Sequence, residues 1–215
     1  MITIAHSAAT VYAAASIMNE LVDALTARLA REVVGDGLAS EVTMDPVHTA
    51  AARDRAEGLV DEAIGSAAQV LRPATIREPD AGAGGYIVSP AIVIDPPPDS
   101  AIVVSEQFAP VLPILSYQDT EDAIRQANAT SFGLCASIWT NDPDRAALLA
   151  QRLGAGTVFL NAHGMAAMDH TAPFGGWKAS GFGLELGEEG MTAFTRTRVL
   201  RGLAGTRPPS PLSSL

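Results

Sequence analysis

The chain has 215 residues, of which 47% are hydrophobic, and a formal net charge of −10. This hydrophobic content is ample for a full core, which excludes a disordered or fibrous chain. An acidic chain repels the phosphates of nucleic acids and of anionic membrane surfaces, and no apolar run approaches the roughly 20 residues of a membrane helix, so we expect small-molecule or protein partners.

The start of the chain gives no sign of export. Residues 1–12 lack a basic segment followed by an uninterrupted apolar stretch, so a secretion signal is not expected. The single cysteine, Cys135, cannot form an internal disulfide. Together these features predict a cytoplasmic protein.

The first predicted element is a helix over residues 16–32, with Ser16 as its N-cap. Its apolar residues recur at four-residue spacing, namely Ile17, Leu21, Leu25 and Leu29. A second helix is predicted over residues 49–67 and a short strand over 69–71. A helix followed directly by a strand indicates an alternating α/β fold.

The middle of the chain is punctuated by proline and glycine. Residues 72–85 are rich in Pro, Gly, Asp and Glu and predict a surface loop. Residues 86–94 are strand-like but broken at Pro90, and the prolines at 96–98 exclude a helix or a central strand there. The β-branched run 101–104 predicts another short strand.

The second half continues the alternation. It predicts a helix over 119–129 capped by Asp119, a strand over 135–139, and a helix over 142–153 closed by Gly154. An apolar strand follows over 157–160. Residues just past the carboxyl end of a parallel strand border the ligand crevice of α/β sheets, so residues 161–164 are expected near a site.

Seven short blocks of the sequence stand in the order and spacing of one family. These blocks are residues 34–38, 44–47, 84–86, 106–113, 133–140, 156–161 and 173–187. From about residue 10 to about residue 200 the chain resembles the C-terminal half of the aldehyde dehydrogenase superfamily. The resemblance implies a catalytic-domain-like α/β region over 1–200, with a largely parallel sheet flanked by helices and no N-terminal Rossmann cofactor domain. Residues 201–215 are predicted to be a disordered tail.

The resemblance implies oxidation of an aldehyde to a carboxylate. A cysteine thiolate attacks the carbonyl, a hydride passes to NAD or NADP, and a glutamate-activated water hydrolyses the thioester. The family places the cofactor domain, the general base and the oxyanion asparagine upstream of the region matched here. Cofactor binding by this chain alone is therefore doubtful.

The position of the family's nucleophile falls on Ala5, so no catalytic residue is assigned. The only cysteine, Cys135, lies in an apolar strand where the family has no reactive group. Buried cysteines in apolar surroundings have a raised pKa and are inert, which favours a core residue over a nucleophile.

The resemblance still assigns several binding positions. Glu106 matches the carboxylate that accepts from the nicotinamide ribose hydroxyls, and Phe108 the aromatic residue beside the nicotinamide ring. Asn161, His163 and Phe174 are assigned to the substrate pocket, and His170 lies in the same loop. A solvated loop carboxylate, core packing or a scaffold role remains open for these residues. No histidine has Cys, Asp or Glu at ligand spacing, so no metal site is expected.

Three departures from the family pattern affect the expected site. Asp45 and Ala109 stand where glycine is usual, and Leu184 replaces an arginine. If the glycine position at Ala109 requires positive φ, alanine there costs about 1 kcal/mol and displaces the cofactor-contacting loop.

Three classes of function follow. The first is a truncated or split dehydrogenase, inactive alone, whose partner is a separate cofactor-domain polypeptide. The second is a non-catalytic module that docks on full-length dehydrogenase subunits through the strand expected over 195–200, an exposed edge. The third is a small-molecule binder that uses the aldehyde tunnel.

Overall fold

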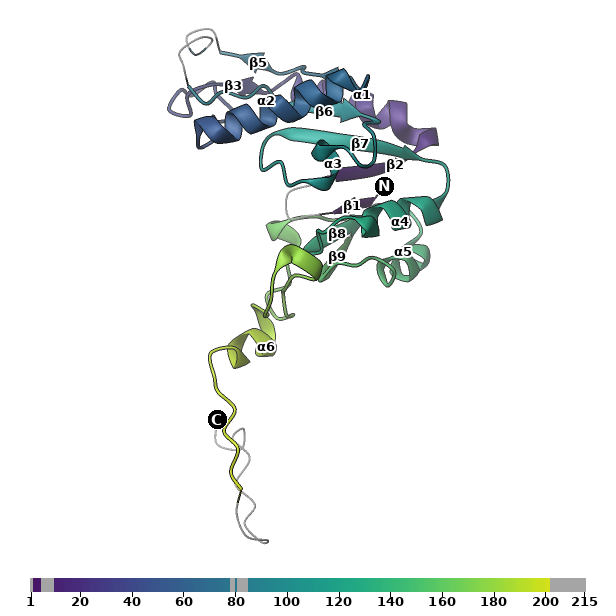
Figure 1. The fold of residues 1–215 in the computed structure, drawn as a ribbon, viewed down its shortest axis with the longest axis vertical. Coiled ribbons are helices and arrows are strands. Elements are labelled where there is room, and N and C mark those ends of the chain that lie inside the picture. Colours follow the sequence, from purple (N-terminus) through teal and green to yellow (C-terminus); the bar gives the residue numbers. More distant parts are fainter. Residues whose placement is uncertain (1, 5–9, 78–79, 81–84, 202–215) are drawn as a thin grey trace.

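The computed structural model describes residues 2–4, 10–77, 80 and 85–201 (Figure 1). A seven-stranded sheet with the order β4-β6-β7-β2-β1-β8-β9 forms its centre. The strands are β1 (Ile2–Ile4), β2 (Thr10–Ala14), β4 (Gln69–Leu71), β6 (Ala91–Ile94), β7 (Val111–Tyr117), β8 (Cys135–Ile138) and β9 (Thr157–Leu160). A separate pair, β3 (Val33–Val34) and β5 (Thr75–Ile76), lies beyond β4.

The sheet is mixed. The pairs β6–β7, β7–β2 and β8–β9 are parallel, whereas β4–β6, β1–β2 and β1–β8 are antiparallel. Only β1 and β4 therefore run against the other five strands. The expectation of a largely parallel sheet is corrected to this extent, because the β1–β2 hairpin inserts an antiparallel strand at the centre.

Helices cover both faces of the sheet. Their bounds are α1 (Met18–Leu29), α2 (Ala50–Gly65), α3 (Ala101–Val104), α4 (Thr120–Ala129), α5 (Pro143–Ala150) and α6 (Gly187–Thr192). Three short 3₁₀ helices lie at Ala15–Ile17, Met165–Ala167 and Lys178–Ser180. Within the described residues, no helix has the length and apolar character needed to span a membrane.

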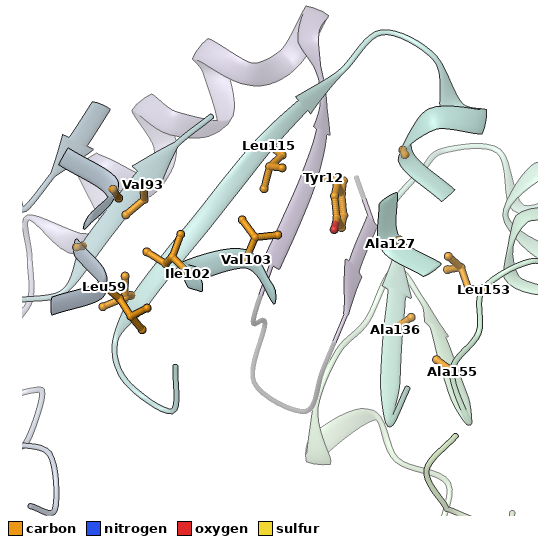
Figure 2. Close-up of a cluster of buried hydrophobic side chains, with 14 of the residues drawn as sticks. Tyr12, Leu59, Val93, Ile102, Val103, Leu115, Ala127, Ala136, Leu153 and Ala155 are labelled. Atoms are coloured by element: carbon orange, nitrogen blue, oxygen red, sulfur yellow. The ribbon is translucent and has the colours of Figure 1, made fainter. Parts of the chain in front are cut away.

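The side-chain alternation of the strands builds two cores. In β2, Tyr12 faces the larger core, formed with α2, α3, α4 and α5, while Val11 and Ala13 face the core beneath α1. Figure 2 shows the larger core, in which Tyr12, Ile102, Val103 and Leu115 meet. The leucine stripe of the first predicted helix packs against Ile92 and Ile114 in the second core.

Three of the six α-helices in the described chain, α2, α4 and α5, begin where the sequence predicts. Asp119 accepts from the amide of Glu121, Asp142 from that of Arg145, and Thr49 from that of Ala52. Each of these side chains satisfies an amide that the first helical turn leaves unpaired. Ser16 is not a cap, because a 3₁₀ turn precedes α1 and its N-cap residue is Ile17. The helix α5 ends at Ala150, before Gly154.

Two predicted strands are wrong. Residues 101–104 form the helical turn α3, in which Val104 and Ser105 donate to the carbonyls four residues earlier. Burial of Ile102 and Val103 in the larger core overrides the strand preference of β-branched residues. The described residues 195–200 form no strand and are exposed. The predicted tail lies outside the described residues after Arg201.

Candidate functional site

The candidate site lies at the edge of the sheet where β6, β7, β2, β8 and β9 begin. Glu106 and Phe108 lie in the connection that enters β7. Ile4 and Thr10 pair with each other at the same edge. They flank the connection that contains Ala5, which itself lies outside the described residues. The topology therefore places the ends of the Ala5 connection and the Glu106 loop at one edge.

Gln107 anchors the Glu106 loop. Its side chain is buried, and its amide nitrogen donates to the carbonyl of Ile102. The Glu106 carbonyl accepts from the Arg55 guanidinium at 2.7 Å, which ties the loop to α2. With Gln107 held inward, Glu106 and Phe108 on either side are exposed. The sequence offered no reason to single out Gln107 or Arg55.

Phe108 carries the backbone strain of this loop. Its φ is 48°, in the left-handed region that a non-glycine residue adopts at a cost of about 1 kcal/mol, and 72% of its surface is exposed. Ala109 is not among the described residues with positive φ. The expected penalty for alanine at position 109 is therefore wrong, because the strained conformation belongs to its neighbour.

Phe174 lies at the same edge through the turn of residues 173–176. It exchanges two backbone hydrogen bonds with Glu185, each 2.7 Å long. Gly156, just before β9, approaches this turn so closely that a Cβ on it would lie 1.8 Å from the Gly175 oxygen. The backbone contact holds Phe174 against the start of β9.

A cavity of about 190 Å³ lies over β9 next to this turn. Phe159 of β9, Met168 and Phe174 line it, and its lining is mostly apolar. Ala167, Met168, Asp169 and Ala172, from the segment between β9 and the turn, form the other side of the cavity. Such a space can hold the body of a small apolar molecule.

The side chain of His163 contacts β9. Its ring packs edge-to-face on Phe159 with the centroids 5.8 Å apart. Both of its ring nitrogens are buried without a hydrogen-bond partner among the residues that the structure describes. A buried unpaired imidazole is costly, so a polar ligand atom would relieve it. His170 is exposed.

Asn161 lies at the opposite edge of the sheet, after the carboxyl end of β9. Its side-chain oxygen accepts from the Thr140 amide and its nitrogen donates to the Thr140 carbonyl, both at 2.8 Å. Its φ is 52°. These bonds hold the carboxyl ends of β8 and β9 together. Glu106 lies at the edge where the strands begin, so Asn161 and Glu106 lie at opposite edges of the sheet.

Lys178 binds the end of α4. Its ammonium donates to the carbonyls of Asn128 and Thr130 at 3.0 and 3.2 Å. These carbonyls have no partner within the helix, so the lysine satisfies them. Lys178 therefore caps the end of α4 while its residue stays exposed. Partial burial lowers the pKa of its ammonium.

Cys135 is in the core of β8, with 1% of its surface exposed. Burial raises the pKa of its thiol, which keeps it protonated and unreactive near neutrality. Among the described residues, no cluster of three His, Cys, Asp or Glu side chains could hold a metal ion.

We expect that Cys135 does not react with a thiol reagent in the native chain. With Ellman's reagent at about pH 8, the folded protein should release no thionitrobenzoate on the timescale in which the urea-unfolded chain releases one equivalent per chain. The ratio of the two rates measures how well β8 protects the thiol. Fast labelling of the folded chain would contradict its placement in the core.

Three comparisons relate the chain to known proteins. Residues 4–200 match the family model described as the aldehyde dehydrogenase family. The chain is 33% identical over 190 residues to geranial dehydrogenase of Castellaniella defragrans, covering 88% of this chain and 38% of the relative. It is 32% identical to aldehyde dehydrogenase [NAD(P)+] 1 of Saccharomyces cerevisiae, with the same coverage.

Solved structures show the same similarity. An aldehyde dehydrogenase of Mycobacterium tuberculosis complexed with NAD+ superposes with a TM-score of 0.81 at 31% identity, covering 93% of this chain and 40% of that one. The G224D mutant of a Bacillus cereus aldehyde dehydrogenase gives 0.78 at 30% identity, covering 88% and 38%. The chain thus spans about two fifths of the length of these proteins.

Proposed function

Because the chain belongs to the aldehyde dehydrogenase family, we propose that it is the C-terminal, catalytic-domain portion of an NAD(P)-dependent dehydrogenase that oxidises aldehydes to carboxylates. We propose further that these 215 residues do not perform the oxidation alone. They supply part of the cofactor and substrate surfaces, and a cofactor-binding polypeptide or a full-length dehydrogenase subunit supplies the rest.

The burial of Cys135 carries this proposal. Oxidation through a thioester needs an accessible thiolate, and the one cysteine of the sequence has 1% of its surface exposed inside β8. Its thiol also has a raised pKa. The family position for the nucleophile is assigned to Ala5, whose methyl group cannot attack a carbonyl. In this proposal the chain can bind an aldehyde, but it has no nucleophile that could form the thioester needed for the oxidation.

The residues of the Glu106 loop fit one end of a nicotinamide cofactor. The Glu106 carboxylate is exposed, and no described residue donates to it, so it is free to accept from two ribose hydroxyls. The exposed ring of Phe108 can pack beside the nicotinamide. When bound, the cofactor would accept the hydride. This chain's part would be to orient the ribose and the ring.

The cavity over β9 supports a substrate role for Phe174, which lines it, whereas His163 is not a lining residue and contacts the cavity only through Phe159. Its apolar lining suits the hydrocarbon part of an aldehyde, and Phe159 joins that lining to the unpaired His163 ring. A polar substrate atom would pair with a nitrogen of the buried His163 ring only if that ring turned toward the cavity. In this proposal Asn161 stabilises the far ends of β8 and β9 and does not contact the aldehyde.

The assay follows NAD(P)H formation with a panel of aldehydes. We expect no turnover by the purified chain, and turnover in a mixture with the product of the nearest upstream reading frame only if that product carries the catalytic cysteine that this chain lacks. Turnover by the chain alone would contradict the nucleophile assignment. If the two proteins form a complex but the mixture produces no NAD(P)H, docking would be favoured over a split enzyme.

A second function is favoured by the exposed apolar residues near the C-terminal end of the described chain. Phe182, Met191 and Phe194 have 105%, 69% and 90% of their surfaces exposed. Figure 1 shows α6 extending away from the sheet. Exposed aromatic residues in one segment are typical of a protein-interaction surface. We propose a dehydrogenase subunit as the partner, so the chain would act as a docking module without catalysis of its own.

A further inference from the structure

A cavity separate from the proposed catalytic edge lies between β2, α3 and α4. Its volume is about 280 Å³. Pro98, Val104 and Ala129 supply apolar surface to its lining. Its polar groups come from Tyr12, Gln126 and Thr130 and from the charged residues Asp99 and Arg125, of which Arg125 pairs with Asp122. None of the residues assigned above to the cofactor or the aldehyde lines it. A ligand here would therefore bind to a different site.

Tyr12 brings a hydroxyl without a partner to this cavity. Only 1% of the residue's surface is exposed, and none of the described residues makes a hydrogen bond to its hydroxyl. Figure 2 shows the ring between Val103 and Ala127, with the oxygen at its free tip. Burial raises the pKa of Tyr12 to about 12, so the hydroxyl stays protonated and can donate at neutral pH.

Gln126 brings an acceptor without a partner. Its side-chain nitrogen donates to a carboxylate oxygen of Asp122 at 2.7 Å. The carboxylate can only accept, so this bond requires the amide nitrogen to face Asp122 and the oxygen Oε1 to point elsewhere. Oε1 is buried and has no partner within the described chain. Its orientation is therefore fixed by Asp122, and its bonding capacity is unused.

A donor and an acceptor, both unpaired, thus line one small cavity. Buried polar groups are normally paired, and the Gln126 oxygen is a buried one that lacks a partner within the described chain. A single functional group that both accepts and donates would satisfy the two. A primary amide does so with its carbonyl toward Tyr12 and its nitrogen toward Gln126, and an alcohol does so with one hydroxyl.

We propose that this cavity binds a small uncharged molecule that bears a primary amide or hydroxyl group on a short aliphatic body. The apolar surfaces of Pro98, Val104 and Ala129 would contact the aliphatic part. A carboxylate has no proton to donate to Gln126, and an ammonium has no lone pair to accept from Tyr12. Either charged group would therefore leave one of these two atoms unpaired, although Arg125 and Asp99 at the lining could attract it.

The test uses isobutyramide and the complete 215-residue chain. Titration followed by two-dimensional amide NMR should give saturable shifts, while isobutyrate at equal concentration should give none. Tyr12→Phe keeps the ring but removes the donor, and it should weaken isobutyramide binding roughly five- to tenfold. The matched control Tyr117→Phe removes a hydroxyl from a half-buried tyrosine outside this cavity, and it should leave the affinity unchanged.

The stability of the variants separates binding from a structural role. Because the Tyr12 hydroxyl has no partner in the described chain, Tyr12→Phe should not lower Tm relative to the wild type. Three results would overturn the proposal. They are no saturable binding of isobutyramide, the same Kd for the wild type and Tyr12→Phe, or equal binding of isobutyrate.

Discussion

Replacing Gly156 by alanine is expected to lower the free energy of unfolding by about 3 kcal/mol. The added Cβ would lie 1.8 Å from the Gly175 carbonyl oxygen, far inside van der Waals contact. Relief requires backbone movement, because the obstacle is a main-chain atom and not the end of a flexible side chain. Gly156 and Trp177 both donate to the Gly133 carbonyl at 2.9 Å, so this movement also disturbs the turn that carries Phe174.

Gly58→Ala is the matched control. Gly58 lies inside α2 and is exposed, and no described atom beyond its two chain neighbours and the backbone of α2 lies within 4 Å of the position of its added Cβ. Alanine there should raise the free energy of unfolding by about 0.5–1 kcal/mol, because it restricts the unfolded chain and favours the helix. Urea unfolding followed by circular dichroism measures both variants. Equal stability of Gly156→Ala and the wild type would show that the turn does not pack on β9 as described.

Local signals in the sequence predicted elements well where the physical cause is itself local. Asp119 and Asp142 are short acceptors placed directly before helices, and each caps the helix that follows. The predictions failed where the burial of side chains, and not the local sequence, determines the secondary structure. The run 101–104 has the composition of a strand, but its helical turn buries Ile102 and Val103. The central strand β7 was not predicted, and its interior Pro113 is an unusual residue at a position of the sheet ladder.

The residues of the candidate site also divide into those that the sequence indicates and those whose role depends on tertiary packing. Sequence blocks led to Glu106 and Phe108, which the structure exposes side by side at one edge. The rule that ligands bind beyond the carboxyl ends of strands led to Asn161, which lies at the other edge and binds the Thr140 backbone. Nothing in a sequence indicates that Gln107 anchors the loop, since its contact depends on how α3 packs.

Ala5→Cys is expected to introduce a reactive thiol into a chain that has none accessible. The strands β1 and β2 pair from Ile4 and Thr10 outward, and residues 5–9 connect them at the edge where the Glu106 loop enters β7. If Ala5 occupies the nucleophile position, a cysteine there should react with Ellman's reagent in the folded protein, whereas Cys135 should not. The variant should then release one equivalent before unfolding and a second after it.

In complex with a cofactor-binding portion that supplies the general base, Ala5→Cys should raise NAD(P)H formation from an aldehyde by about a hundredfold or more over the wild-type complex, because covalent catalysis becomes available. Ala8→Cys is the matched control, since it makes the same substitution three positions further along the same connection. It should be labelled but should not restore turnover, because a misplaced nucleophile gains nothing from the cofactor and the base. Equal turnover by both variants would show that the register at Ala5 is wrong. Labelling of Ala5→Cys without turnover in an assembled complex would show that a thiolate at position 5 is not sufficient for catalysis.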